Sequence, residues 1–260
     1  MGGRIRTERQ GGLGWIIFDH PQRRNAISAE MWQAIPAAAQ GLDADPDVRV
    51  VIMRGAGDVA FVSGADISEF EQNRSGVGAE AYDQQNARAF VALATLRKPL
   101  IALIHGFCVG GGCALSLTAD LRYAADDAVF AIPAARLGLG YNAAGLEMLV
   151  NIVGYAAAKE IFFTARRFTA AEALHMGLVN RVVPKAELDA MVQRTAEEIA
   201  TNAPLTIRSA KLILGELTKD PTHRDHTAIA ESIGACYAST DYAEGVRAFL
   251  EKRRPDFKGR

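Results

Sequence analysis

The sequence predicts an α/β fold followed by a helical C-terminal region. Short apolar runs that end at glycine or proline are spaced by segments with helical periodicity, as in alternating strands and helices. The runs are almost continuously apolar, which is typical of parallel strands covered on both faces. From residue 154 onward, helical patterns follow one another with only short breaks. Together these observations predict one parallel α/β core with helices after it.

Two strands and one helix are expected in the N-terminal part of the chain. The run GWIIFDHP, residues 14–21, predicts a strand that stops at Pro21, and VRVVIMRG, residues 48–55, predicts a second strand. Between them, apolar residues recur at helical spacing after Ser28, which is a suitable N-cap. The order strand, helix, strand is the start of an α/β arrangement.

The middle of the chain repeats this pattern, and the end of the chain does not. PLIALIHG, residues 99–106, predicts a third strand, residues 110–125 a buried helix with a short strand after it, and AVFAIP, residues 128–133, another strand. Helical patterns cover most of the remainder, over residues 154–165, 169–177, 187–204, 206–217 and 234–255. We expect a core over residues 1–195 and a helical region over residues 196–260.

The composition is that of an ordinary globular enzyme. The chain has 260 residues, of which 49% are hydrophobic and 23% charged, so it can bury a large core. Its net charge of −1 offers no overall basic surface for a nucleic acid. The N-terminal residues lack the apolar run of a signal peptide, and no apolar stretch approaches the roughly 18 residues of a membrane span. We therefore expect a cytoplasmic protein without membrane or nucleic-acid partners.

The cysteines and histidines do not form the pattern of a metal site. Cys108, Cys113 and Cys236 are odd in number and have no CxxC spacing, so buried thiols are expected. His223 and His226 form an HxxH pair with no third ligand nearby, which favours a solvated helix face. The sequence also has no phosphate-loop, dinucleotide-binding or GxSxG motif. It therefore predicts neither a bound metal nor the common nucleotide or hydrolase chemistries.

Two glycine-rich segments, residues 60–70 and 105–117, share one arrangement. In each, glycine follows an apolar strand and precedes a helix-forming run, which leaves backbone N–H groups without an acceptor in the helix. Two such donors that converge on one carbonyl oxygen form an oxyanion hole. The alternative is that the glycines only permit tight turns between strand and helix.

Five motifs cover nearly the whole chain. In chain order they are AFxxGADI, KPxIAxIxGxxxGGG, FxxPxxxLG, FTAxxAxxMGLVNxVVP and AFLEKRxPxF. In content and order they resemble the crotonase superfamily, also called the enoyl-CoA hydratase/isomerase family. The resemblance implies a ClpP-like spiral of ββα units, a C-terminal helical region that forms a homotrimer or homohexamer, and an acyl-CoA substrate. Coenzyme A would be part of that substrate, so no separate cofactor and no metal is expected.

The resemblance also implies where the site lies. The backbone N–H groups of Ala65 and Gly111 would form the oxyanion hole. The residues that line the bound coenzyme A would be Ser63, Gly64, Ala65, Asp66 and Ile67, with Arg24 near them. Lys252 and Phe257 match residues that reach coenzyme A, often from a neighbouring subunit, and the alternative for them is a solvated tail. Asp66 and Asp120 match family aspartates for which we expect structural roles.

The two glutamates that transfer protons in a hydratase of this family are replaced. The matching positions hold Ala114 and Ala134, whose methyl groups cannot exchange a proton. General acid–base catalysis contributes roughly 10²- to 10⁴-fold, so ordinary hydration is disfavoured, and so are the family's isomerase and hydrolase reactions. What remains is chemistry in which enolate stabilisation is the main requirement.

Decarboxylation of a methylmalonyl-CoA-type thioester meets this requirement, because the departing carboxylate itself supplies the electrons. A lyase of this kind is therefore the first prediction. Methylmalonyl-CoA decarboxylase is similar at Tyr141, at Asn142 and in the DYxEGxxAFLEKR ending, but has histidine and threonine where Ala65 and Pro133 stand. Tyr141 would orient the substrate carboxylate through its hydroxyl, and its alternative role is to pack the pocket wall.

Two other functions stay open at this point. The chain could be a divergent enoyl-CoA hydratase with another acid or base, such as Glu147, or a non-catalytic acyl-CoA-binding protein. Residues 70–95 are expected to form the variable pocket wall that selects the acyl group. The sequence assigns no role to Arg136.

Overall fold

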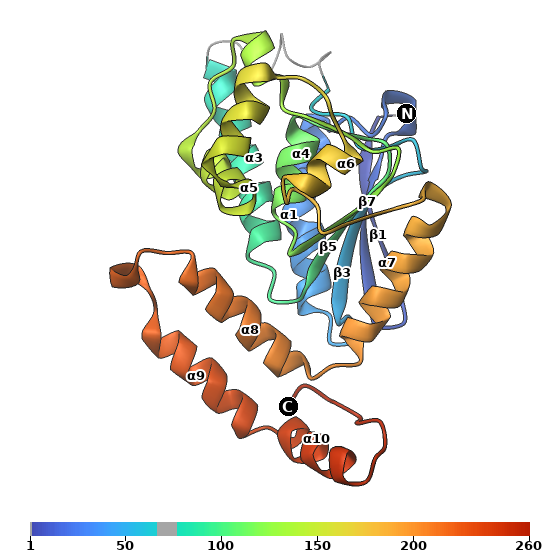
Figure 1. Ribbon diagram of the computed structural model, residues 1–260, viewed down its shortest axis with the longest axis vertical. Coiled ribbons are helices and arrows are strands. Elements are labelled where there is room, and N and C mark those ends of the chain that lie inside the picture. The colour runs from blue at the N-terminus through green and yellow to red at the C-terminus, as the bar shows by residue number, and fades with distance from the viewer. Residues whose placement is uncertain (1, 67–76) are drawn as a thin grey trace.

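Two β-sheets with helices packed around them form the body of the protein, and a helical arm extends from it (Figure 1). The structure is a computed structural model that describes residues 2–66 and 77–260. The larger sheet has the strand order β1-β2-β3-β5-β7-β10. Its strands are β1 (Arg4–Gln10), β2 (Leu13–Asp19), β3 (Val50–Gly55), β5 (Leu100–Ile104), β7 (Leu121–Ala125) and β10 (Arg181–Val183). Only β1 and β2 pair antiparallel in this sheet. The strands predicted at 14–21, 48–55 and 99–106 are confirmed as β2, β3 and β5.

The smaller sheet has the strand order β4-β6-β8-β9. Its strands are β4 (Ala60–Val62), β6 (Phe107–Val109), β8 (Val129–Ala131) and β9 (Phe168–Thr169). The first three each follow a strand of the larger sheet after a short turn, and a helix comes after each pair of strands. These helices are α3 (Val77–Ala94), α4 (Gly111–Leu117) and α5 (Ala143–Thr164). This succession is the repeated ββα unit implied by the sequence.

The main core lies between the two sheets and the helices α1 (Ala29–Ala44), α3, α4, α5 and α6 (Ala170–His175). It contains the largest fully buried side chains, among them Trp32, Phe18 and Phe61. A second cluster packs α7 (Lys185–Ala200) on the opposite face of the larger sheet. Ser28 caps α1 as expected, because its hydroxyl accepts a hydrogen bond from the Met31 N–H at 3.3 Å.

The arm consists of α8 (Pro204–Leu217), α9 (His226–Tyr237) and α10 (Thr240–Leu250), and it extends away from the sheets (Figure 1). A cavity of about 680 Å³ opens along it and is lined mainly by apolar side chains, including Leu205, Ile213, Ile233, Tyr237, Phe249 and Phe257. The predicted division between core and helical region, at 195/196, falls inside α7, which packs on the sheet, and the arm begins after this helix. The division itself stays a prediction. Within the described ranges, no helix is long and apolar enough to cross a bilayer.

Candidate active site

Ala65 lies in a short extended segment after β4 that is held against Ile27. The Ile27 N–H donates to the Gly64 carbonyl oxygen, and the Asp66 N–H donates to the Ile27 carbonyl oxygen, both at 2.9 Å. This parallel bridge uses the groups on either side of Ala65, so the Ala65 N–H points away from Ile27. Gly64 has φ +117°, a conformation that glycine adopts without strain.

Gly111 begins α4 directly after β6. The preceding Gly110 has φ +54°, and its N–H donates to the Ala131 carbonyl oxygen at 2.8 Å. As N-cap, Gly110 contributes no side chain, and the first N–H groups of a helix have no acceptor within it. Gly112 packs so tightly on β4 that a Cβ there would lie 2.2 Å from the Val62 carbonyl oxygen. The glycines therefore bring α4 against the smaller sheet and leave the Gly111 N–H exposed to a ligand.

The two segments converge. A Cβ built on Gly111 would lie 3.9 Å from the Ala65 nitrogen. In the part of the chain that the structure describes, neither the Ala65 N–H nor the Gly111 N–H has a hydrogen-bond acceptor. Two adjacent free donors can bind one carbonyl oxygen, as an oxyanion hole does. The roles expected for Ala65 and Gly111 are compatible with this geometry and stay predictions.

The two positions without glutamate are buried. Ala114, in the middle of α4, is 7% exposed. Ala134, in the short helix η3 (Pro133–Leu137), is 4% exposed. A methyl group is all that either residue offers. Glu147, the other carboxylate considered, lies on α5 and is exposed, as is Arg136 on η3. Nothing at positions 114 and 134 can transfer a proton.

Tyr141 and Asn142 lie where η3 leads into α5. The Asn142 side-chain oxygen accepts a hydrogen bond from the Gly145 N–H at 2.8 Å and so caps α5. The Tyr141 ring packs edge-to-face on Phe162, with 4.9 Å between ring centroids, and is half-buried. The sequence assigned no role to Asn142, although Asn three residues before a helical N–H is a cap signature. The orienting role of Tyr141 stays a prediction.

The residues expected near coenzyme A are joined in one network. Ser63 donates its N–H to the Arg24 carbonyl oxygen and its hydroxyl to the Arg23 carbonyl oxygen, both at 3.1 Å. The Arg23 guanidinium contacts the buried Asp66 carboxylate at 3.4 Å, which agrees with a structural role for that aspartate. The backbone of Arg24 is left-handed, with φ 51°. Ile67 lies outside the described residues.

Beside this network, aromatic and cationic side chains make contacts that no sequence motif predicted. The Arg24 guanidinium lies over the Phe107 ring at 4.6 Å from its centroid, and that of Arg167 lies 6.0 Å from the same centroid. The Trp32 ring, on α1, lies beside Gly111, 3.3 Å from the position that a Cβ would take there. These contacts join segments far apart in the sequence, so helical or strand periodicity alone could not predict them.

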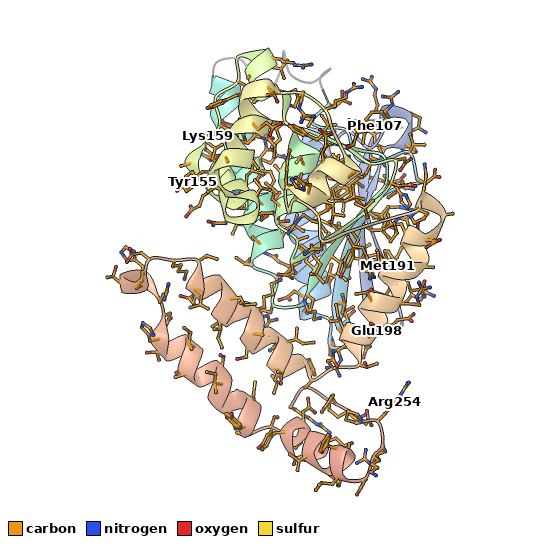
Figure 2. All side chains as sticks on the ribbon, in the orientation of Figure 1. Phe107, Tyr155, Lys159, Met191, Glu198 and Arg254 are labelled. Carbon is orange, nitrogen blue, oxygen red and sulfur yellow. The ribbon has the colours of Figure 1, made fainter. Side chains whose placement is uncertain are left out.

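Lys252 and Phe257 are not brought to the oxyanion hole within one chain. They lie in the C-terminal segment after α10, which also carries Arg254, whereas Phe107 lies near the opposite end of the molecule (Figure 2). Phe257 packs 3.5 Å from the Cβ position of Gly245, and its carbonyl oxygen accepts a hydrogen bond from Arg49 at 3.2 Å. A contact of these residues with bound coenzyme A would have to be made in another copy of the chain.

Two of the three cysteines are buried as expected, and His223 and His226 are exposed, at the end of η4 (Pro221–His223) and the start of α9. Cys108 and Cys113 are buried, and burial raises the pKa of the Cys108 thiol. Cys236 is partly buried. Among the described residues there is no group of three His, Cys, Asp or Glu side chains that could hold a metal ion. Asp120 has a structural role, because it accepts hydrogen bonds from the Leu100 N–H and the Lys211 ammonium, both at 2.7 Å.

Comparison with known proteins supports one family over the whole length. The profile of the family described as enoyl-CoA hydratase/isomerase matches residues 8–260. The crotonyl-CoA hydratase of Syntrophomonas wolfei subsp. wolfei is 35% identical over 253 residues, which is 97% of each chain. The peroxisomal Delta(3,5)-Delta(2,4)-dienoyl-CoA isomerase of Arabidopsis thaliana is 36% identical over 265 residues, with 97% of this chain and 95% of the isomerase covered.

A solved structure agrees with the sequence relatives. The enoyl-CoA hydratase/carnithine racemase from Magnetospirillum magneticum superposes with a TM-score of 0.94 at 36% identity, covering 98% of this chain and 96% of the other. None of these three similar proteins is named as a decarboxylase, so the local similarity to methylmalonyl-CoA decarboxylase gains no support here. The chain belongs to the enoyl-CoA hydratase/isomerase family, within the crotonase superfamily.

Proposed function

We propose that the protein is an enzyme that binds an acyl-CoA thioester with its carbonyl oxygen between the N–H groups of Ala65 and Gly111. The observation that carries this proposal is that these two N–H groups lie on adjacent segments and have no acceptor among the described residues. Donors aimed at a developing enolate oxygen stabilise the transition state more than the ground state, which lowers the barrier. Family membership supports the thioester as substrate class.

The first candidate reaction is hydration of an α,β-unsaturated acyl-CoA. The similar protein from Syntrophomonas wolfei is named a crotonyl-CoA hydratase, which favours this reaction. Water gives up one proton to a base as its oxygen adds to the β-carbon, the C=C electron pair moves to the thioester oxygen in the hole, and an acid then delivers a proton to the α-carbon. Because Ala114 and Ala134 cannot move protons, another group must do so. Glu147, on α5, and the Tyr141 hydroxyl, just before α5, are the candidates.

The second candidate is decarboxylation of a malonyl-type CoA thioester. It is favoured by one specific observation, the buried methyl groups at positions 114 and 134. When carbon dioxide leaves, the electron pair of the broken C–C bond stays on the α-carbon, and the same N–H pair stabilises the resulting enolate. The α-carbon then takes up a proton from solvent water. We expect these methyl groups to line the pocket beside that carbon, and an apolar wall there suits a reaction in which a carboxylate leaves as an uncharged molecule.

Incubation of the purified protein with crotonyl-CoA and, separately, with methylmalonyl-CoA distinguishes the candidates. The thioester products are followed by mass spectrometry. Addition of water supports the hydratase, and loss of carbon dioxide supports the decarboxylase. Tight binding of both thioesters without turnover contradicts the proposed catalysis and favours a non-catalytic acyl-CoA-binding protein. The Glu147→Gln and Tyr141→Phe variants then show which side chain takes part.

We also propose that the chain acts as a homotrimer or homohexamer. Exposed apolar side chains on the arm support association there, since Phe249 is 83% and Leu250 is 75% exposed. The cytoplasmic location, and the expectation of no cofactor beyond substrate coenzyme A, stay predictions. Sedimentation of the purified protein measures the number of copies directly.

A further inference from the structure

One segment of the chain, residues 27–32, contacts both halves of the oxyanion hole. At its start, Ile27 holds the residues on either side of Ala65 through two backbone hydrogen bonds of 2.9 Å. At its end, the Trp32 ring atoms Cζ2 and Cη2 lie 3.3 and 3.7 Å from the Cβ position of Gly111. The first turn of α1 joins the two ends, because the Trp32 N–H donates to the Ser28 carbonyl oxygen at 3.0 Å.

The Trp32 side chain is held in place by its own contacts. It is 1% exposed, and its Nε1–H donates to the Tyr82 hydroxyl at 3.1 Å. Its ring also packs edge-to-face on Phe90, with centroids 5.5 Å apart. Both partners belong to α3. The indole can move away from Gly111 only by breaking this buried hydrogen bond and its packing.

The start of α4 has little rigidity of its own. Residues 110–112 are three consecutive glycines, the residue type with the greatest backbone freedom. Among the described residues no side chain caps the helix. The hydrogen bond from Gly110 to Ala131 holds one end of this run and the packing of Gly112 on Val62 holds the other, with Gly111 between them. The position of the Gly111 N–H therefore depends on what packs against it.

We infer that Trp32 is a positioning residue that holds Gly111 at the separation from Ala65 at which both N–H groups reach one oxygen. The inference rests on the proposed function, because it requires a thioester oxygen bound between these donors. Such donors act at about 2.7–3.1 Å from the oxyanion. A displacement of Gly111 by about 1 Å would therefore remove one of the two. Trp32 does this through Gly111 and without touching the reacting atoms.

The test uses the polarisation of a bound thioester, which does not depend on which reaction the enzyme performs. Butyryl-CoA labelled with ¹³C at the thioester carbonyl can be neither hydrated nor decarboxylated. Bound to the wild type, its carbonyl stretch in the infrared difference spectrum should fall below that of free butyryl-CoA, because two N–H groups polarise the bond. In Trp32→Ala the decrease should be less than half as large. The dissociation constant should change by less than about threefold, since the contacts to coenzyme A remain.

Ile35→Ala is the matched control. Ile35 is fully buried on the same helix, so its truncation perturbs the same core without removing the contact to Gly111. This variant should keep the wild-type frequency decrease. Trp32→Phe, which keeps a ring, and Tyr82→Phe, which removes the acceptor of the indole N–H, should both give intermediate decreases.

The outcomes separate this inference from the proposal on which it rests. A full wild-type decrease in Trp32→Ala overturns the inference, and so does an equal loss in Ile35→Ala. If Trp32→Ala does not fold, a full decrease in both Trp32→Phe and Tyr82→Phe overturns it instead. Absence of any decrease in the wild type overturns the proposed function itself.

Discussion

Two helices of this protein begin in opposite ways. At the start of α6, the Thr169 hydroxyl accepts a hydrogen bond from the Glu172 N–H at 3.2 Å, and the Glu172 carboxylate accepts one from the Thr169 N–H at 2.8 Å. At the start of α4, glycines provide no cap and the Gly111 N–H has no acceptor within the described chain. The N-terminal N–H groups of α6 are therefore capped by side chains of the protein, whereas the Gly111 N–H of α4 can donate to the oxygen of a ligand.

This difference between a side-chain cap and free backbone N–H groups shows which part of the site tolerates sequence change. An oxyanion hole made of backbone N–H groups needs small residues and tight packing, but no particular functional side chain. Proton transfer needs specific side chains, and positions 114 and 134 hold only alanine. The backbone part of the site therefore does not depend on which reaction follows at the α- and β-carbons.

The largest expected effect comes from displacing α4. In Gly112→Ala the new methyl group would lie 2.2 Å from the Val62 carbonyl oxygen, so α4 must move away from β4. We expect kcat/KM to fall about 10²- to 10³-fold, because one donor leaves the hole. Urea unfolding should show a loss of about 3 kcal/mol of unfolding free energy.

Gly41→Ala is the control for this change. Gly41 lies in α1, and a Cβ there meets nothing within 4 Å. The substitution should leave activity unchanged and stabilise the helix by up to about 1 kcal/mol. Wild-type activity in Gly112→Ala would mean that α4 does not supply a donor.

The next largest expected effect comes from adding proton-transfer groups at positions 114 and 134. Ala114→Glu combined with Ala134→Glu places two carboxylates beside an intact hole, and crotonyl-CoA hydration should rise about 10²-fold or more. The pair Ala114→Gln and Ala134→Gln has nearly the same size but cannot transfer protons, so it should stay at the wild-type rate. Equal rates in the two folded double variants would contradict the role given to these positions.

A smaller effect on stability is expected at the start of α5, where the Asn142 side chain caps the helix. Asn142→Ala removes the acceptor of the Gly145 N–H, and the protein should lose about 1 kcal/mol of unfolding free energy. Asn142→Ser keeps a capping oxygen and should retain most of the stability. Thermal unfolding compares the two, and the same midpoint in both variants would exclude a capping role.

The smallest effect is a pH dependence at the capped helix α6. Hydrogen bonds from the Thr169 N–H and from Arg166 lower the pKa of Glu172 from 4.5 to about 2. Because the folded-state pKa is depressed, this contribution to stability is present above about pH 4.5 and is lost as the pH falls toward 2. The stability difference between the wild type and Glu172→Gln should follow that course in urea unfolding. A difference that is constant with pH would contradict it.

Much of the body was predictable because its elements are local. The apolar runs of β2, β3 and β5 show in the sequence, and the capping box at 169–172 is visible as TAAE. The charged strand β1 was not predicted, since it is an edge strand with mostly exposed residues. The three-residue strand β6 is too short to give a periodic signal.

The site was predictable where glycine marks the backbone and not where distant side chains meet. The GAD and GGG motifs identified the two donor segments. The packing of Trp32 beside Gly111 joins α1 to α4, between which the chain forms the four strands β3, β4, β5 and β6, and only the folded chain reveals it. The position of the arm likewise depends on packing between copies or segments that local patterns do not encode.

The pair of donors is tested most directly by a crystal structure of the protein with bound butyryl-CoA. The thioester oxygen should lie about 2.7–3.1 Å from the nitrogens of both Ala65 and Gly111. The α-carbon should face the methyl groups of Ala114 and Ala134. A thioester oxygen bound away from either nitrogen would contradict the assignment of the oxyanion hole.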